Sequence, residues 1–323
     1  MRPQPRLQLL ALTTLLVLMG IPAHAQTYPS KPVRIIIGYT PGTGVDIVAR
    51  HLGEFLAKSM GQAFIAENRP GAAGTIAAAF VATAPADGHT LLIDSSSHTS
   101  VPAVMPSLPF DTARDFSGVT TLVENPLVLV ASRAKGFGTI RDLVAAAKAN
   151  PGSVSYASTG FGSSTHISAE KFRVGAKFEG IHVPMKSTTE AITEIMAGRM
   201  DFTYTALTTA LPGIRDGRLV ALAMSNRRSV LLPGIPTIEE AGIPNSAYSS
   251  WLGMVVASKT SREIVNRLFQ ETAKALANPD MLDRLAKIGA EPSTMTPDEF
   301  DALRRKELAE NLILMKNVGI KPQ

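Results

Sequence analysis

The sequence predicts an α/β protein built from two domains with mostly parallel sheets. Apolar, β-branched runs alternate along the chain with segments whose apolar residues recur at helical spacing, which is typical of α/β folds. Glycine-rich loops separate several of these runs from the helices that follow them. The length of 323 residues suits two domains of roughly 100–200 residues each. A composition that is 45% apolar and 18% charged provides for two cores and excludes wholesale disorder.

The first half of the chain begins with a strand, a glycine-rich loop and a helix. Val33–Ile37 is a continuous β-branched run, which predicts a buried strand. After the loop, the apolar residues between Val45 and Leu56 form one stripe and predict a helix. The pattern then recurs, with strands expected at residues 63–67, 89–93, 119–123 and 127–130, an alanine-rich helix after Gly74, a polar loop at 94–100 and a helix at Ile140–Ala149.

The second half repeats the theme. A strand at residues 153–158 leads into a loop of Gly, Ser and Thr residues and then a helix that contains Ile167. From Arg262 to the end of the chain the spacing of apolar residues is helical. Between these segments we expect strands at residues 178–183, 201–205, 219–224 and 251–256, and a helix at 191–197 that Gly198 closes.

Two chain crossings are expected between the domains. Residues 124–126 separate two β runs and suit a first hinge. The return is expected within residues 225–250, which are rich in Pro and Gly. The prediction is a discontinuous first lobe of residues 26–124 and 226–323, and a second lobe of residues 125–225.

Residues 1–25 have the layout of a cleavable export signal. Arg2 and Arg6 precede a short apolar stretch, and residues 23–25 form an A-x-A cleavage pattern. The apolar stretch is shorter than the ~20 residues that a membrane-spanning helix needs. Cleavage leaves a chain that begins at Gln26 with a formal charge of +3 and no dense basic run, so no nucleic-acid partner is expected.

The sequence lacks the residues and motifs that several kinds of site require. There is no cysteine, which excludes disulfides, thiol nucleophiles and Cys-ligated metals. The histidines show no metal-binding spacing, and no G-x-S-x-G motif indicates a hydrolase. Ile47 stands at the third glycine position of G-x-G-x-x-G, and no Gly-Lys-Ser/Thr follows, so neither nucleotide motif is present. We therefore expect no metal, no cofactor and no catalytic residue.

Two loops at predicted helix starts carry the candidate binding residues. Residues 42–44 follow the first strand, where free N–H groups and the helix dipole suit an anion. The alternative there is an ordinary tight turn in which Asp46 compensates the dipole. Residues 160–165 have the same chemistry in the second lobe, and the alternative is that their hydroxyls are N-caps. A ligand held between the lobes explains both loops together, with residues 95–97 as a further wall.

Several segments in this order resemble the Bug-type periplasmic solute-binding receptors of tripartite tricarboxylate transporters. The resemblance covers essentially the whole chain after residue 25. Each motif is weak alone, and the ordered set is specific. The matching segments include residues 67–75, 87–88, 108–111, 147–152, 162–166, 182–184, 236–242 and 251.

This resemblance implies a type II periplasmic-binding-protein fold, with two α/β lobes joined by a hinge and a ligand cleft between them. It implies a non-catalytic, periplasmic receptor that captures a small organic carboxylate and delivers it to the membrane permease of such a transporter. A ligand-sensing subunit of a signalling system and a periplasmic enzyme on the same fold are the alternatives. We expect the receptor to be a monomer.

The carboxylate is expected to meet backbone N–H groups of the first loop and hydroxyls from both lobes. His166 is expected to fix its own loop by hydrogen bonds. Where the family commonly has a tyrosine in the Val-Pro-Tyr-Lys-Gly segment, this sequence has Met185, which predicts a softer wall and a more apolar far end of the ligand. The predicted ligand-binding residues are Tyr39, Thr40, Gly42, Thr43, Gly44, Asp46, Ser95, Ser96, Thr159, Gly162, Ser163, Thr165, His166, Met185 and Thr205.

Overall fold

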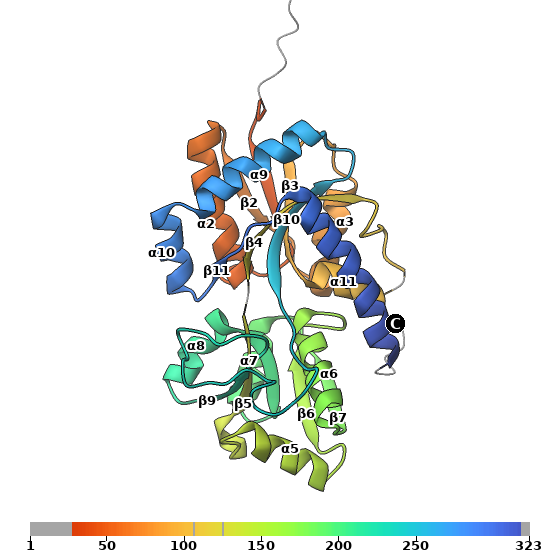
Figure 1. Cartoon of the computed structure of the whole chain (residues 1–323), viewed down its shortest axis with the longest axis vertical. Helices are drawn as coiled ribbons and strands as arrows, with labels where there is room; N and C mark the ends of the chain where they lie inside the picture. The colour runs from red at the N-terminus through yellow and green to blue at the C-terminus, as the bar shows by residue number, and fades with distance from the viewer. Residues whose placement is uncertain (1–27, 106, 125, 318–323) are drawn as a thin grey trace, which may run out of the picture.

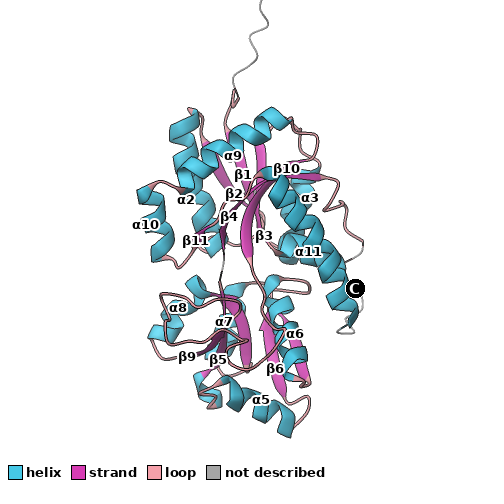
Figure 2. Ribbon diagram, viewed as in Figure 1, coloured by secondary structure: helices cyan, strands magenta, loops and turns pink. Residues whose placement is uncertain are grey.

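The computed structural model describes residues 28–105, 107–124 and 126–317, which form two α/β lobes (Figure 1). Each lobe has a central sheet flanked by helices (Figure 2), which confirms the predicted fold class. The predicted export signal, residues 1–25, lies outside the described residues.

The first lobe contains a six-stranded mixed sheet with the order β11-β4-β10-β3-β1-β2. Strand β1 is parallel to both of its neighbours, whereas β10 is antiparallel to β3 and β4. The strands are β1 (Val33–Ile37), β2 (Phe64–Asn68), β3 (Thr90–Ser95), β4 (Phe116–Glu124), β10 (Trp251–Ala257) and β11 (Glu291–Pro292).

The second lobe contains a five-stranded sheet with the order β7-β6-β8-β5-β9. Strand β6 is parallel to β7 and β8, and β5 is antiparallel to β8 and β9. Both sheets are more mixed than the sequence predicts, because the strand that enters each lobe from the other runs against its neighbours. The strands are β5 (Leu127–Ser132), β6 (Val154–Ser158), β7 (Gly180–Pro184), β8 (Phe202–Ala206) and β9 (Leu219–Met224).

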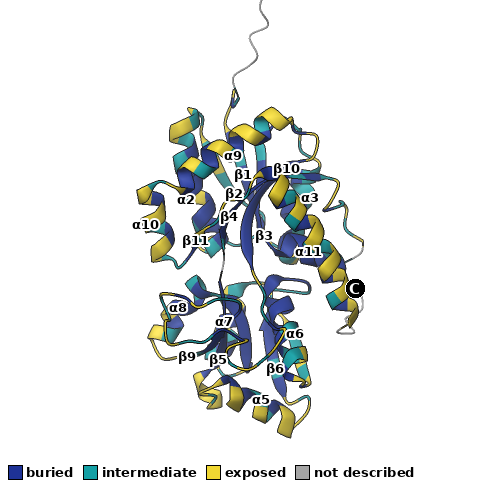
Figure 3. Ribbon diagram, in the orientation of Figure 1, coloured by how far each residue is buried: buried dark blue, intermediate teal, exposed yellow. Residues whose placement is uncertain are grey.

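Helices cover both faces of the first sheet and bury its strands (Figure 3). Ile35 and Ile37 pack with the apolar stripe of α2, while Ile36 lies in a separate cluster with residues of α3 and α11. This alternation is the expected consequence of side chains pointing to opposite faces along a strand. The helices of this lobe are α2 (Gly44–Met60), α3 (Thr75–Ala82), α9 (Arg262–Leu276), α10 (Pro279–Lys287) and α11 (Pro297–Asn317), and those of the second lobe are α5 (Ile140–Ala149), α6 (Ser164–Ala176), α7 (Thr188–Met196) and α8 (Leu207–Arg215).

The chain crosses between the lobes at two places. β4 ends at Glu124 in one sheet and β5 begins at Leu127 in the other. The return leads into β10, so it lies at the far end of the segment that the sequence predicts. Residues 226–248, predicted in the first lobe, pack on the second: the Ile238 N–H donates to the Met224 carbonyl at 2.7 Å, and Ile238 and Ile243 join the second-lobe core.

Besides the two chain crossings, the lobes are in contact at a short helix, α4 (Ser97–Ser100). The sequence predicts a polar loop at this place. The Ser164 N–H donates to Ser97 Oγ at 3.2 Å, and the Ser100 hydroxyl donates to the Gly162 carbonyl. A Cβ at Gly162 would lie 2.5 Å from Val104 Cγ2, so only glycine permits this approach. These hydrogen bonds explain how so polar a segment is buried.

Candidate functional site

A cleft of about 750 Å³ lies between the lobes, a size that suits a small organic ligand. The first lobe contributes the loop after β1, the loop after β2 and Met105. The second lobe contributes the loop after β6 and the segment that leads into α7. The lining residues are Gly38, Tyr39, Thr40, Thr43, Pro70, Gly71, Ala72, Ala73, Met105, Thr159, Gly160, Phe161, Met185, Lys186, Ser187 and Thr188.

A smaller pocket of about 40 Å³ adjoins the cleft, and we call it the hydroxyl pocket. Tyr39, Thr43, Thr159 and Thr188 line both spaces, so the two are continuous. Its remaining lining includes the start of α2 and further hydroxyl side chains from both lobes. The complete set is Tyr39, Thr43, Gly44, Val45, Ser95, Leu127, Thr159, Ser164, Thr165, Thr188, Ala206 and Thr209.

The start of α2 has no side-chain cap. Thr43 occupies the N-cap position, but its hydroxyl donates to the Thr40 carbonyl at 2.9 Å instead of accepting a helix N–H. Within the described chain, the N–H groups of Gly44 and Val45 find no hydrogen-bond partner, and both residues line the hydroxyl pocket. Free donors and the positive end of the helix dipole therefore meet at this pocket, which suits a carboxylate.

Asp46 holds the first loop from behind rather than lining the cleft. Its carboxylate accepts hydrogen bonds from the Gly42 N–H at 2.9 Å, the Arg50 guanidinium at 3.0 Å and the Asn68 amide at 2.8 Å. Burial raises the pKa of Asp46, but these hydrogen bonds outweigh it and hold the pKa below its ordinary value. Asn68 also donates to the Tyr39 carbonyl at 3.0 Å, so the network fixes both ends of the loop.

Serine and threonine hydroxyls of the second loop accept several of its own N–H groups. Ser163 is the N-cap of α6, and its hydroxyl accepts from the His166 N–H at 3.2 Å and donates to the Gly160 carbonyl at 2.7 Å. The Thr165 hydroxyl accepts from the Thr159 N–H at 3.0 Å. Ser163 is therefore an N-cap, one of the two interpretations that the sequence left open, whereas Ser164 and Thr165 line the hydroxyl pocket.

A pair of stacked histidines supports this second loop. His166 Nδ1 accepts from the Gly162 N–H at 3.1 Å, and its ring lies 4.1 Å from that of His182 between centroids. His182 Nε2 lies 2.6 Å from the Ser158 hydroxyl. Burial lowers the pKa of His166 to about 4, with a further contribution from Arg173, and lowers the pKa of His182 to about 3. Both rings are neutral near pH 7, as acceptors for the loop must be.

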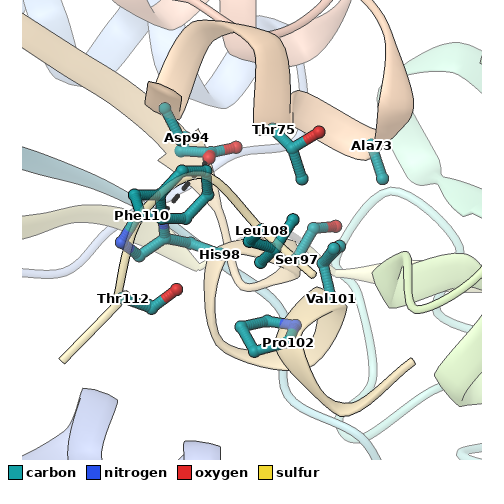
Figure 4. Close-up of a pocket in the computed structure, with 11 residues that line it drawn as sticks. Ala73, Thr75, Asp94, Ser97, His98, Val101, Pro102, Leu108, Phe110 and Thr112 are labelled. Atoms are coloured by element: carbon teal, nitrogen blue, oxygen red, sulfur yellow. Dashed lines mark ion pairs between the residues drawn. The ribbon is translucent and has the colours of Figure 1, made fainter. Parts of the chain in front are cut away.

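The loop after β2 forms a third wall, which the sequence did not assign to the site. Ala72 and Ala73 adopt left-handed backbone angles, with φ of 46° and 53°. Beneath them Asp94 accepts the Ser95 N–H at 2.8 Å and lies 3.6 Å from His98 Nδ1 (Figure 4). The cavity between these groups has only about 10 Å³, room for one water at most. The cavity is too small for a ligand, and the groups around it serve to support the third wall.

The structure brings part of the predicted ligand-binding set to the two spaces. The residues that line them are Tyr39, Thr40, Thr43, Gly44, Ser95, Thr159, Thr165 and Met185. The residues that do not are Gly42, Asp46, Ser96, Gly162, Ser163, His166 and Thr205, which instead hold loops, lobe contacts or the β8 core. Ser96, for example, lies 3.2 Å from the Ser250 hydroxyl and accepts from Tyr248.

Sequence reasoning missed several lining residues. Residues 70–73 follow a strand in the same strand–loop–helix pattern as the first loop, and this pattern was the available signal. Phe161 lies inside the predicted second loop, but a lone aromatic residue there does not indicate its direction. Met105 and Thr188 carry no sequence signal, because only the packing of the two lobes brings them to the cleft.

The charge of the site is low. Among the described residues that line the two spaces, Lys186 is the only charged one, and it is exposed. The Tyr39 hydroxyl lies 2.6 Å from Ser95 Oγ, and burial raises the pKa of Tyr39, so this hydroxyl stays protonated. The described part of the chain holds no group of three His, Asp or Glu arranged for a metal, and its helices include none long and apolar enough to cross a membrane.

Comparisons with known proteins bear on this site. The family described as tripartite tricarboxylate transporter family receptor matches residues 48–320. The chain belongs to this receptor family. BugT of Bordetella pertussis is 32% identical over 324 residues, which cover 96% of this chain and 99% of BugT. The predicted resemblance to Bug-type receptors is therefore confirmed.

Two solved structures share the fold of this receptor closely. Rpa4515 of R. palustris, solved with adipate, is 30% identical with a TM-score of 0.87 over 92% of this chain and all of its own. MatC of Rhodopseudomonas palustris, solved with bound malate, is 28% identical with a TM-score of 0.82 over 89% of this chain and 99% of its own. The receptor therefore has the two-lobed architecture of periplasmic binding proteins.

Proposed function

We propose that this receptor captures a small organic carboxylate between its lobes in the periplasm and delivers it to the membrane permease of a tripartite tricarboxylate transporter. One observation carries the proposal: the uncapped start of α2 presents free N–H groups to a hydroxyl-lined pocket between the lobes. Adipate and malate, named for two similar structures, are both carboxylates, which supports an anion at this position.

The cleft favours binding over catalysis. The described lining residues include no His, Asp or Glu that could serve as a general acid or base. Closure of the lobes about the two crossings brings Thr159 and Thr188 onto a ligand held by Gly44 and Val45, and removes its water. We propose that the receptor is a monomer, exported to the periplasm with residues 1–25 removed.

A thermal-shift screen of small mono-, di- and aromatic carboxylates tests this function. A ligand at about a hundredfold excess over its Kd stabilises the folded state by roughly 2.7 kcal/mol. At roughly 2–4 °C per kcal/mol this raises Tm by about 5–10 °C. Neutral amides of the same acids should leave Tm unchanged, because free N–H donors favour an anion. Equal shifts from acid and amide, or turnover of the acid, would contradict the proposal.

A further inference from the structure

The side chains around the site divide by chemistry into two regions. Hydroxyl groups and the start of α2 surround the hydroxyl pocket. The larger cleft beside it also has hydroxyl side chains, such as those of Ser187 and Thr188, but apolar side chains on four separate segments of the chain form one of its walls. We call this second set the apolar wall, and it consists of Ala72, Ala73, Met105, Phe161 and Met185.

The apolar wall is anchored to the cores of both lobes. Met105 and Phe161 pack on one cluster with the buried side chains of Val104 and Ile167, so the wall is continuous from the first lobe to the second. Met185 packs on a core cluster of the second lobe. Phe161 also meets the His182 ring edge to face, with 4.8 Å between centroids. The three large side chains stay partly exposed, so each presents an apolar face to the cleft.

A second carboxylate would find no side-chain donor within this wall. Methionine, phenylalanine and alanine side chains offer no donor, and an ionised group without one pays a large desolvation cost. Lys186 is the only cation among the described lining residues, and it lies exposed at the rim. Exposed ion pairs contribute little to binding.

This inference rests on the proposed function and narrows its ligand. We propose that the ligand carries a single carboxylate and an apolar body the size of an aromatic ring, with the carboxylate in the hydroxyl pocket and the ring against Met105, Phe161 and Met185. The hydroxyl pocket adjoins the cleft through Tyr39 and Thr159, so one molecule spans both regions. Methionine sulfur against a ring edge, and the Phe161 ring, are favourable contacts for such a body.

Isothermal titration of the mature chain, freed of co-purified ligand by exhaustive dialysis, tests the proposal with four acids. Acetate and phenylacetate differ by a ring, and hexanoate and adipate differ by a terminal carboxylate. We expect phenylacetate to bind at least 100-fold more tightly than acetate, because burial of the ring contributes to affinity. Hexanoate should bind at least tenfold more tightly than adipate, because the second carboxylate of adipate loses water at the apolar wall without gaining a partner. Adipate binding as tightly as hexanoate would overturn the inference.

The outcomes separate this inference from the proposed function. If only dicarboxylates bind, the receptor function stands and the single-carboxylate inference is wrong. If none of the four acids binds, nor any acid of the wider screen, the proposed function fails and the inference falls with it.

Substitutions in the apolar wall test whether the ring of the ligand lies against it. Met185→Gln and Met105→Gln keep side-chain length and add a polar amide, and each should weaken phenylacetate about tenfold while adipate changes less than twofold. Met60→Gln is the matched control, because Met60 is partly buried at the far end of α2 and lies outside the cleft. Unchanged phenylacetate affinity in both cleft variants would overturn the placement.

Discussion

The helices α2 and α6 begin in loops of similar composition, one in each lobe, and they differ in whether a side chain caps the helix. At α6 the Ser163 hydroxyl accepts the His166 N–H, and the Ser164 N–H donates to Ser97 of the first lobe. At α2 the Thr43 hydroxyl turns back to Thr40, and the N–H groups of Gly44 and Val45 face the hydroxyl pocket without a partner in the described chain. We therefore propose that the uncapped start of α2 binds the ligand, whereas the Ser163 cap serves to fix the loop before α6.

The two loops also differ in what holds them. The first depends on an ionised group, because Asp46 binds Gly42, Arg50 and Asn68. The second depends on neutral rings, because His166 accepts from Gly162 and His182 pairs with Ser158. The residue types of the two loops do not show which loop depends on a charged group, but substitution and pH dependence can.

The largest effect is expected from Gly44→Asp. The new carboxylate would occupy the ligand's place, and we expect affinity for any carboxylate ligand to fall at least 100-fold by isothermal titration. The fold should survive, since Gly44 is not in the left-handed region and an acidic residue in the first turn complements the helix dipole. Gly234→Asp is the control, because a Cβ there meets open space. Unchanged affinity in Gly44→Asp would show that α2 does not hold the anion.

Acid should loosen the second loop at a higher pH than the first. The folded pKa values of His166 and His182 are about 4 and 3, below the ordinary 6.5, so the unfolded chain binds more protons in this window. The free energy of unfolding should therefore fall as pH drops from 6.5 toward 3, by on the order of 3 kcal/mol for each histidine. Asp46, whose pKa is also lowered, contributes above its ordinary 3.8 and loses that contribution only below it.

Urea unfolding across this pH range measures the difference. His166→Asn retains an acceptor for the Gly162 N–H and should flatten the dependence between pH 6.5 and 4. Asp46→Asn should alter it only at lower pH. A profile between pH 6.5 and 4 that is the same in wild type and His166→Asn would contradict the assignment of the neutral histidine.

A smaller effect is expected from Ser163→Ala. Loss of an N-cap costs about 1 kcal/mol, which lowers Tm by roughly 2–4 °C. Carboxylate affinity should change less than threefold, because Ser163 itself lines neither the cleft nor the hydroxyl pocket. A loss of affinity as large as that of Gly44→Asp would remove the distinction between the two loops.

The smallest effect is expected from salt. In the proposed site the anion meets neutral N–H and hydroxyl groups, and the only charged lining residue described, Lys186, is exposed. Raising ionic strength from about 0.05 to 0.5 M should change Kd less than about threefold, since screening acts on charge pairs. A steep salt dependence that Lys186→Ala removes would assign the anion to that side chain instead.

The sequence predicts most of the fold because its periodicity is strong. The run Val33–Ile37, the stripe of α2 and the repeated glycine loops define strands and helices without tertiary information. The segment with Ser97–Ser100 was predicted wrongly as a loop, since a buried polar helix is stabilised by partners such as Gly162 and Ser164 that are distant in sequence.

The candidate site was predictable at the level of loops and less so at the level of side chains. Tyr39, Thr43 and Gly44 lie where a ligand after β1 should be, because the carboxyl end of a strand and the start of a helix define that place. Asp46 and His166 share those loops but point into supporting networks. Met105 reaches the cleft only through the docking of the lobes, which no local pattern encodes.

The close approach at Gly162 gives a means of engineering this receptor as a sensor. A single methyl group there would lie 2.5 Å from Val104 and act as a wedge at the contact between the lobes, at a position that does not itself line the cleft. Apparent affinity falls with the fraction of molecules in the competent arrangement, even when every ligand contact is kept. A substitution at position 162 should therefore shift the ligand concentration range over which the sensor responds, while the side chains that contact the ligand stay unchanged.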